Sequence, residues 1–515
     1  MLISVDMARA MASISAEIQR QVGVMLDRRG RVGAVVVGDA RSLFLPDIQR
    51  RGRDRLCGLR LIHTHLAEEP LTDDDLTDLA LLRLDVVAAL TVRGGEPHLV
   101  HVAHLIPDNE AEEPWMVLPP KPVHQMEEDF PEFIAALEEE FQHKQRPRLA
   151  NDTRDRAILI HVSTLPPSLA QDSMLELREL AQSAGIDVVH EFKQRRPLDP
   201  RFVMGRGKMQ SVVITAMQKG AELLVFDLNL SPSQVRSLSD FTDLKVLDRT
   251  QVILDIFAQH AETREGKLQV ELAQLRYLLP ILNMKQAALS RLTGGIGGRG
   301  PGETKLEIDR RRARDRIARL EREVEQLGKR RRLRRRPRKD KGTPTVAVVG
   351  YTNAGKSTLL NNLTNSDVVA KDFLFATLNP VSRRLRFPRE REVIITDTVG
   401  FIRNLPKDLL AAFRTTFEEL HEADVLLHIV DVSSPDVSEK IDTVLETIRA
   451  LELDYKPMIT VFNKIDKCNP TEVDGLVRQY EGIALSALDR ATFGSLLDAL
   501  ETRLFPEDTE DGCGS

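Results

Sequence analysis

The sequence predicts a multidomain α/β protein that ends in a doubly wound parallel sheet. Its 515 residues are enough for three or four domains. Apolar, strand-like runs alternate with helix-like segments over two long stretches, which is typical of sheets covered by helices. A glycine-rich loop at 350–358 stands between the apolar run VAVV and the helix-like run LLNNL. Together these observations favour a strand, a phosphate-binding loop and a helix in succession.

The first half of the chain predicts two small α/β domains. Residues 1–150 carry short apolar runs, such as GAVVVGD and HLVHVAHLI, between acidic segments, and form an N-terminal extension whose role the sequence does not reveal. In 151–250 the strand-like runs AILIHVS, DVVHEF and ELLVFDL alternate with helix-like segments. This second stretch predicts a small sheet covered by helices.

A histidine pair in the N-terminal extension raises the question of a metal site. His63 and His65 fall on one face of a predicted strand, and Asp75 follows. Their order is similar to that of the zinc ligands in JAMM-type domains, where two imidazoles and a carboxylate hold the metal. The spacing to Asp75 is one residue shorter than that pattern, and no suitable upstream glutamate is present. The favoured interpretation is therefore a pair of surface histidines.

Residues 251–341 predict a helical hairpin with a basic linker. Leucines recur from Leu268 to Leu279 at spacings of four, three and four, and a second apolar stripe runs through about 303–335. Two such stripes on either side of one loop favour antiparallel helices. The loop TGGIGGRGPGE at 293–303 is long and flanked by basic residues, which favours a tip that contacts an anionic partner over a simple flexible turn.

The net charge of −6 conceals a strongly basic stretch beside this hairpin. The run KRRRLRRRPRKDK at 329–341 is typical of a surface that binds phosphate groups of nucleic acid. A solvated basic linker is the alternative. Aromatic residues are nearly absent from the run, so stacking on single-stranded bases is not expected to dominate binding.

Residues 342–505 predict a nucleotide-binding domain, and 506–515 an acidic tail. GYTNAGKST matches the phosphate-loop pattern G-x-x-x-x-G-K-S between a strand and a helix. Glycines let backbone N–H groups converge on phosphate oxygens, the lysine reaches the outer phosphates, and the serine hydroxyl binds Mg²⁺. The predicted phosphate-binding residues are Gly350, Tyr351, Thr352, Asn353, Ala354, Gly355, Lys356, Ser357 and Thr358.

Two further segments predict the metal and hydrolysis site. Asp397 and Gly400 end the strand EVIIT, where a carboxylate serves Mg²⁺ and a glycine N–H faces the γ-phosphate. Thr377, in the loop KDFLFATLNP with Phe375, is the candidate that caps Mg²⁺ when a γ-phosphate is present. The predicted metal ligands are Ser357, Thr377 and Asp397, and the predicted catalytic residues are Lys356, Thr377 and Gly400.

The predicted base pocket selects guanine. Asn463, Lys464 and Asp466 follow the strand MITVF, and the Asp466 carboxylate is suited to accept both N–H donors of the guanine edge. Adenine presents the opposite hydrogen-bond polarity and would leave that carboxylate unpaired. Ser486 and Ala487 complete the pocket after the strand GIAL. The motifs in this order predict a GTPase.

Hydrolysis is expected to need an external activator. Phe401 follows DTVG at the position where many GTPases have a glutamine that orients water. In several GTPases that have an apolar residue after the DTVG glycine, an asparagine at the position of Asn353 in the phosphate loop holds a K⁺ ion. Asn353 therefore suggests K⁺ as a second cation. The charge of a cation beside the β/γ bridge would then assist hydrolysis.

The chain resembles the HflX family of ribosome-associated GTPases. The resemblance rests on GGIGGRGPGETKLEIDRRR, GYTNAGKST, DFLFATLNP, DTVGFI and NKID, and covers roughly 157–504. It implies binding to ribosomal RNA of the large subunit and splitting or rescue of stalled or idle ribosomes. The tip residues that would contact RNA are Gly294, Gly295, Gly297, Gly298, Arg299 and Gly300. Some members bind ATP through the N-terminal domain, but 157–250 has no phosphate-loop spacing.

We expect a monomeric GTPase that binds GTP or GDP with Mg²⁺, and with K⁺ as an additional candidate. Few cysteines and no membrane-spanning run predict a cytoplasmic protein, with ribosomes or the membrane periphery as sites of association. Two other functions are kept. One is an RNA-binding or remodelling factor for which the GTPase is a timer, and the other is a switch that recruits a protein partner through residues 1–150.

Overall fold

In the computed structural model the chain forms two compact units. One unit comprises Met1–Leu175 and Gly185–Leu247, and the other Glu176–Ala184 and Asp248–Ser515. Among the residues described, no helix is both long and apolar enough to cross a membrane. The structure describes residues 2–43, 45, 56–106, 114–126, 129–151, 154–293, 305–339, 343–364, 375, 381–387, 391–398, 400–403 and 414–506.

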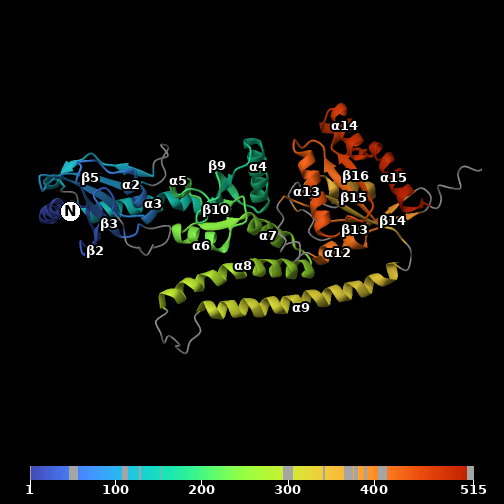
Figure 1. Ribbon diagram of the computed structural model, residues 1–515, viewed down its shortest axis with the longest axis horizontal. Coiled ribbons are helices and arrows are strands. Elements are labelled where there is room, and N and C mark those ends of the chain that lie inside the picture. Colours follow the sequence, from blue (N-terminus) through green and yellow to red (C-terminus); the bar gives the residue numbers. More distant parts are fainter. Residues whose placement is uncertain are drawn as a thin grey trace, which may run out of the picture. The chain divides into compact units, whose positions relative to one another are not determined.

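The N-terminal extension folds around a mixed sheet of order β2-β1-β3-β4-β5-β6, with β7 beside β5 (Figure 1). Strand β3 pairs with β1 on one side and β4 on the other, so it lies inside the sheet. Its elements are α1 (Val5–Ile18), β1 (Val22–Asp27), β2 (Val32–Val37), β3 (Leu59–His65), α2 (Asp73–Leu82), β4 (Val86–Arg93), β5 (Glu96–Leu105), β6 (Trp115–Val117), β7 (Lys121–Pro122) and α3 (Phe130–Asn151).

The prediction of surface histidines in this extension is wrong. His63 and His65 are 0% and 1% exposed. Alternation of polar residues indicated a half-exposed strand, but both faces of β3 are covered. Helix α1 covers the face of Thr64, whose hydroxyl lies 2.7 Å from the Ser15 hydroxyl, and the histidines occupy the opposite face.

The second sheet has the order β11-β10-β8-β9, and β8 pairs in parallel with both β10 and β9. Alternating strands and helices build it, as the sequence predicts, and the short strand β11 was not anticipated. Its elements are β8 (Arg156–Ser163), α4 (Pro167–Ser183), β9 (Asp187–Arg195), α5 (Arg206–Gln218), β10 (Leu223–Phe226), α6 (Pro232–Phe241) and β11 (Lys245–Asp248).

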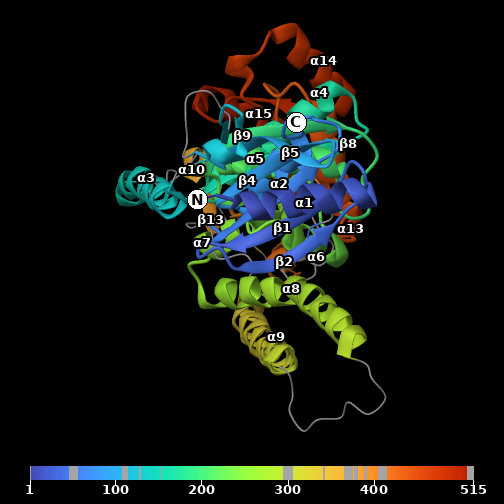
Figure 2. The same ribbon diagram turned by 90° about the vertical axis from the view of Figure 1, so that its left-hand side faces the viewer.

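The helical hairpin consists of α8 (Arg264–Thr293) and α9 (Lys305–Lys339), which run side by side in two perpendicular views (Figures 1 and 2). Leu272 and Leu320 are buried, and Arg316 forms a bidentate ion pair with Glu271 at 2.7 and 2.8 Å. A separate helix, α7 (Arg249–His260), precedes α8. The helical pattern that begins near 251 is therefore interrupted.

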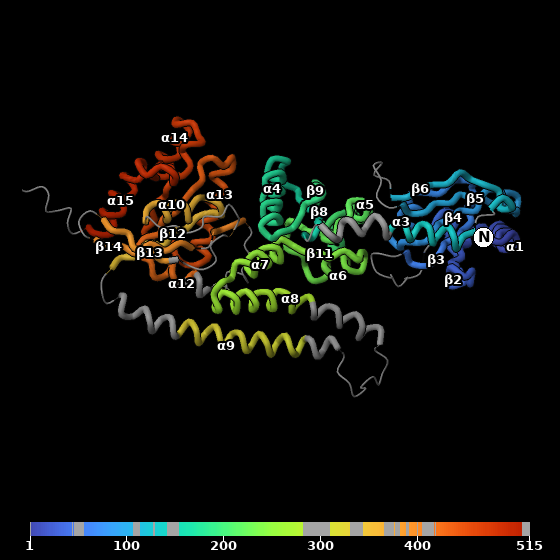
Figure 3. The backbone as a smooth tube through the Cα atoms, turned by 180° about the vertical axis from the view of Figure 1, so that it is seen from behind, coloured from blue at the N-terminus to red at the C-terminus, as the bar shows by residue number. Residues whose placement is uncertain are grey.

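Thr263 explains this interruption, because its hydroxyl accepts a hydrogen bond from the Gly266 N–H at 3.0 Å and so caps the start of α8. The glycine-rich tip at 294–300 lies outside the described residues, and its RNA contacts stay a prediction. Figure 3, which views the protein from behind, shows that α7, α8 and α9 follow one another along the chain.

The third sheet has the order β13-β14-β12-β15-β16-β17 and is parallel except where the unforeseen β13 pairs antiparallel with β14. The predicted doubly wound sheet is confirmed. Its elements are β12 (Thr345–Gly350), α10 (Lys356–Thr364), β13 (Val381–Arg386), β14 (Glu392–Asp397), α12 (Arg414–Glu422), β15 (Val425–Asp431), α13 (Val437–Ala450), β16 (Met458–Asn463), α14 (Pro470–Tyr480), β17 (Ile483–Ala484) and α15 (Gly494–Leu504).

Two hydrophobic clusters cover the two faces of this sheet. Ile429 and Val461 pack with residues of α10 and α15, whereas their strand neighbours Val430 and Phe462 pack with α13 and α14. Successive residues of a strand face opposite sides, so the helices lie on both faces. This burial fixes the carboxyl ends of the parallel strands, where the predicted motifs follow.

Candidate nucleotide-binding site

The phosphate loop follows β12, the strand that β14 and β15 flank. A Cβ atom on Gly350 would lie 2.3 Å from the Ile429 carbonyl oxygen, so the neighbouring strand leaves no room for a side chain. Asn353 and Gly355 have φ angles of 62° and 88°. These left-handed conformations turn the loop back toward α10, as a phosphate-binding loop requires.

Lys356 is buried beneath this loop at the start of α10. Its Nζ donates hydrogen bonds to the carbonyl oxygens of Tyr351 at 2.8 Å and Gly350 at 3.3 Å. Burial lowers the pKa of Lys356 to about 8, against the opposite effect of the Asp397 carboxylate. The phosphates of a nucleotide would supply the negative charge that favours its ammonium form.

The segment that follows β14 is paired with the phosphate loop through its backbone. The Phe401 N–H donates to the Gly350 carbonyl at 3.0 Å, and the Thr352 N–H donates to the Phe401 carbonyl at 2.8 Å. A Cβ atom on Gly400 would lie 3.0 Å from the Lys356 Nζ. Glycine at this position therefore allows the close approach that a γ-phosphate contact needs.

Phe401 itself is fully buried, with its ring centroid 6.1 Å from that of Phe417 in α12. An apolar, buried ring offers no hydrogen bond to an attacking water. The structure thus agrees with the expectation that the chain's own residue at this position does not orient water.

Ser357 and Asp397 lie together and fit a Mg²⁺ ion. The Ser357 hydroxyl donates to Asp397 Oδ2 at 2.7 Å, so a hydroxyl and a carboxylate from different elements meet. Oxygen donors of this kind, supplemented by phosphate oxygens and water, are the ligands that Mg²⁺ prefers. Thr377, the third predicted ligand, lies outside the described residues and stays a prediction.

The predicted base pocket assembles from three motifs. Asn463 Nδ2 donates to the Ala354 carbonyl at 2.8 Å, and Asn463 Oδ1 accepts the Ala487 N–H at 2.7 Å. Asn463 thereby ties the phosphate loop to the segment after β17. The Ser486 hydroxyl donates to Asp466 Oδ1 at 2.6 Å and orients that carboxylate. Its position and charge suit the N–H donors of guanine.

Lys464 has a structural partner that the sequence did not reveal. Its Nζ contacts Asp431 Oδ2 at 2.6 Å and the Asn353 carbonyl at 2.9 Å. Asp431 ends β15, so its position at the carboxyl edge of the sheet could have marked it. The contact draws the base-pocket motif against the phosphate loop.

Phe375 occupies a different setting from the other predicted nucleotide-binding residues. Its ring is buried, with the centroid 4.7 Å from that of Phe257 in α7. The side chain thus packs on α7, and a contact of this residue with nucleotide stays a prediction.

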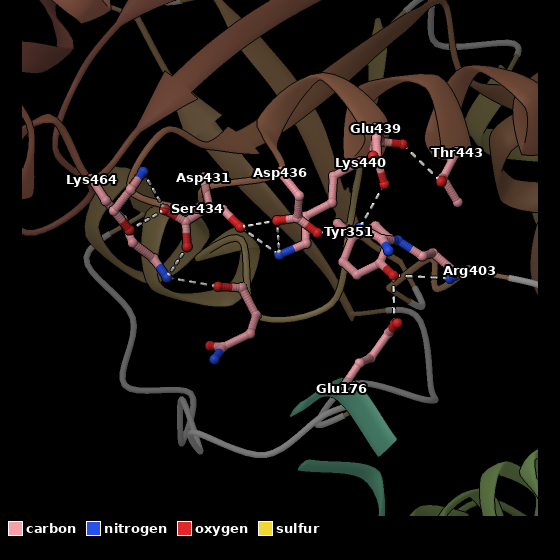
Figure 4. Close-up of polar contacts among 12 residues, drawn as sticks. Glu176, Tyr351, Arg403, Asp431, Ser434, Asp436, Glu439, Lys440, Thr443 and Lys464 are labelled. Carbon is pink, nitrogen blue, oxygen red and sulfur yellow. Dashed lines mark hydrogen bonds and ion pairs between the residues drawn. The ribbon is translucent and has the colours of Figure 1, made fainter. Parts of the chain in front are cut away.

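Tyr351 links the phosphate loop to two other segments, as Figure 4 shows. Its hydroxyl accepts the Arg403 backbone N–H at 3.0 Å and donates to Glu176 Oε1 at 2.5 Å. Burial and the Glu176 carboxylate raise the pKa of this phenol well above its ordinary value, so it stays protonated and can donate. Lys440 lies over the ring at 5.3 Å from its centroid.

Glu176 extends this link from the phosphate loop to α7. Its Oε2 lies 2.9 Å from a guanidinium nitrogen of Arg249, the first residue of α7. Glu176 belongs to α4 and is 175 residues away from Tyr351 in sequence. No motif spacing could have identified it, because only the tertiary fold brings the two side chains together.

Comparisons with known proteins agree with this geometry. A family model described as GTP-binding GTPase N-terminal matches residues 171–258, and one described as GTP-binding GTPase middle region matches 260–338. A third, described as 50S ribosome-binding GTPase, matches 345–464 and so includes the phosphate loop. The three matches follow the chain from the second sheet through the hairpin to the nucleotide site.

Individual relatives extend over most of the chain. The GTPase HflX of Caldanaerobacter subterraneus subsp. tengcongensis is 46% identical over 360 residues, which cover 70% of this chain and 82% of the relative. The GTPase HflX of Escherichia coli K12 is 43% identical, with 69% and 84% covered. A GDP complex of a Sulfolobus solfataricus GTP-binding protein is 24% identical, covering 68% of this chain and 100% of that one, with a TM-score of 0.38.

Nucleotide binding is expected to weaken as the pH rises above about 8, the pKa of Lys356 in the free protein. Bound phosphates raise this pKa, so the bound protein holds more protons than the free protein. Affinity then falls as the pH passes the free-state pKa, by up to about tenfold per pH unit. Calorimetric titration with GDP from roughly pH 7 to pH 9 measures this slope.

Lys356→Met provides the control, since it removes the titrating ammonium group. The GDP affinity that remains in this variant is expected not to fall with pH. A wild-type affinity for GDP that does not change with pH over this range would contradict a Lys356 pKa of about 8 in the free protein.

Proposed function

Because the chain belongs to the HflX family of GTPases, we propose that its GTP-bound form binds the large ribosomal subunit and separates the subunits of stalled or idle ribosomes. The observation that carries this proposal is the match of 345–464 to a 50S ribosome-binding GTPase model. Hydrolysis to GDP would then release the protein. It would act as a monomer in the cytoplasm.

The hairpin supplies the surface for ribosomal RNA. Residues 329–339 of the basic run belong to helix α9, and α8 and α9 are joined by the glycine-rich segment that carries Arg299. A dense array of arginines binds phosphates and makes affinity depend steeply on salt. Glycines let the backbone approach RNA closely where a side chain would collide.

The nucleotide site reaches the hairpin through α7. Phe375, in the loop expected to sense the γ-phosphate, packs on Phe257 of α7. Tyr351 contacts Glu176, which in turn contacts Arg249 at the start of the same helix. A change on GTP binding in the loop of Phe375 or in the phosphate loop of Tyr351 would bias the position of α7. Because α8 begins four residues after α7 ends, the change would reach the hairpin.

Each residue of the nucleotide site would have a separate role in binding or hydrolysing GTP. Lys356 neutralises the outer phosphates, Asp466 selects guanine, and Gly400 allows its segment to approach the γ-phosphate. Mg²⁺, held by Ser357 and Asp397, would supply charge neutralisation when bound. Because Phe401 cannot position water, ribosome contact would have to order Thr377 and the segment around Gly400 for rapid hydrolysis.

K⁺ is the proposed additional cation. Asn353 is exposed on the phosphate loop, with φ 62° and its carbonyl held by Lys464. With a nucleotide bound, its side chain would lie beside the β- and γ-phosphates. A monovalent ion there would add positive charge where charge develops during hydrolysis.

Co-sedimentation with ribosomes tests the proposed function. The purified protein is loaded with a non-hydrolysable GTP analogue or with GDP, and the subunit ratio is followed. Retention on the large subunit with loss of intact ribosomes is expected only with the analogue. Arg299→Ala should weaken binding, whereas the control Arg264→Ala, whose side chain is 81% exposed at the far end of α8, should not.

Two results would contradict the proposal. One is failure to bind ribosomes in either nucleotide state at low salt. The other is tight binding to free structured RNA that ignores the nucleotide and leaves ribosomes intact, as expected of an RNA-remodelling factor.

The cation preference of hydrolysis is a separate prediction. The GTPase rate in KCl is expected to exceed that in NaCl by roughly tenfold, because a site near the β/γ bridge must select an ion of suitable size. Asn353→Ala should remove most of the difference while a K⁺-independent rate persists. Equal wild-type rates of GTP hydrolysis in KCl and NaCl would contradict the proposed K⁺ site.

A further inference from the structure

The buried histidines of the N-terminal extension converge with one carboxylate. The Nε2 atoms of His63 and His65 are 2.9 Å apart, and Asp75 Oδ1 lies 3.0 Å from His63 Nε2. Asp75 Oδ2 lies 3.5 Å from His65 Nε2. Among the described residues, these three form a group of side chains whose ligand atoms could share one metal ion.

These distances suit a zinc-like centre. Metal–ligand bonds of about 2.0–2.1 Å at a tetrahedral ion place neighbouring ligand atoms roughly 3.3 Å apart. The separation of the two imidazole nitrogens, 2.9 Å, and that of His63 Nε2 from Asp75 Oδ1, 3.0 Å, lie within a few tenths of an ångström of that value, and the other Asp75 oxygen lies 3.5 Å from His65 Nε2. Two imidazole nitrogens and one carboxylate oxygen are also the donor types that zinc accepts.

Neighbouring groups already orient two of the ligands. His65 Nδ1 lies 3.0 Å from the Glu69 carbonyl oxygen, which can only accept, so Nδ1 carries a proton and Nε2 is the nitrogen left to bind a metal. Thr72 donates to Asp75 Oδ2 from its backbone N–H at 2.8 Å and from its hydroxyl at 2.7 Å. Such outer contacts are typical of metal ligands.

The capping role of Asp75 does not account for the histidines. Thr72 and Asp75 form a capping box at the start of α2, which explains why an acid stands there. It does not explain two imidazoles whose Nε2 atoms face each other in a buried space.

We propose that His63, His65 and Asp75 bind one divalent transition-metal ion of the zinc class. Three protein ligands leave one coordination position for water or another small ligand. Asp75 is the ligand that retains exposure, 15% of its side chain, and marks the side from which that position is reached. The site lies in the extension, apart from the motifs that bind GTP.

Metal content of the full-length, untagged protein tests this proposal. The protein is stripped with EDTA, incubated with Zn²⁺ in the presence of GDP and excess Mg²⁺ to occupy the nucleotide site, and desalted. Elemental analysis is expected to give about one zinc per wild-type chain and less than about 0.2 in His63→Gln and Asp75→Asn.

His104→Gln is the matched control, because His104 is also a buried histidine of the same sheet but bonds to the Leu105 carbonyl oxygen. It should bind zinc like the wild type. Visible absorption of Co²⁺ added to the stripped wild type gives a readout independent of variant folding, and an intense four-coordinate spectrum is expected. Stripped wild type that takes up neither ion, or His63→Gln and Asp75→Asn that retain full zinc, would overturn the proposal.

Discussion

The backbone pairing between the phosphate loop and the segment after β14 is the constraint on which the nucleotide site depends. Two hydrogen bonds join Phe401 to Gly350 and Thr352, and a Cβ atom on Gly400 would lie 2.8 Å from Thr352 Cγ2 and 3.0 Å from Lys356 Nζ. The segment after β14, which is expected to contact the γ-phosphate, is thus expected to move together with the phosphate loop. A nucleotide that alters one is expected to alter the other.

Tyr351 carries this constraint away from the phosphates. Its hydroxyl is held between the Arg403 backbone and the Glu176 carboxylate, and Glu176 also binds Arg249. A hydrogen bond to a charged group contributes about 1.5–3 kcal/mol, which is enough to bias two arrangements of α7 by a factor of ten or more. Phe375, from the loop predicted to sense the γ-phosphate, packs on Phe257 of the same helix. We therefore expect α7 to receive both changes and to pass them to the hairpin.

Sequence spacing predicted what depends on local geometry. The phosphate loop between β12 and α10, the motifs at the ends of β14 and β16, and the alternation of strands and helices all follow from patterns within a few residues. Glu176 and its link to Tyr351 could not be found this way, since 175 residues separate them. The burial of His63 and His65 was missed for a related reason. Strand alternation gives the face of a residue but not whether a helix from elsewhere covers that face.

Hydrogen–deuterium exchange of the free protein, compared between GDP and a non-hydrolysable GTP analogue, tests the proposed coupling most directly. Exchange of α7 and of 176–184 should differ between the two nucleotides, whereas β8, which belongs to the other unit, serves as an internal reference that stays unchanged. Glu176→Gln should reduce the difference in α7, and Asp172→Asn, the same charge change one turn earlier on α4, should preserve it. Identical exchange of α7 in both nucleotide states would contradict the account.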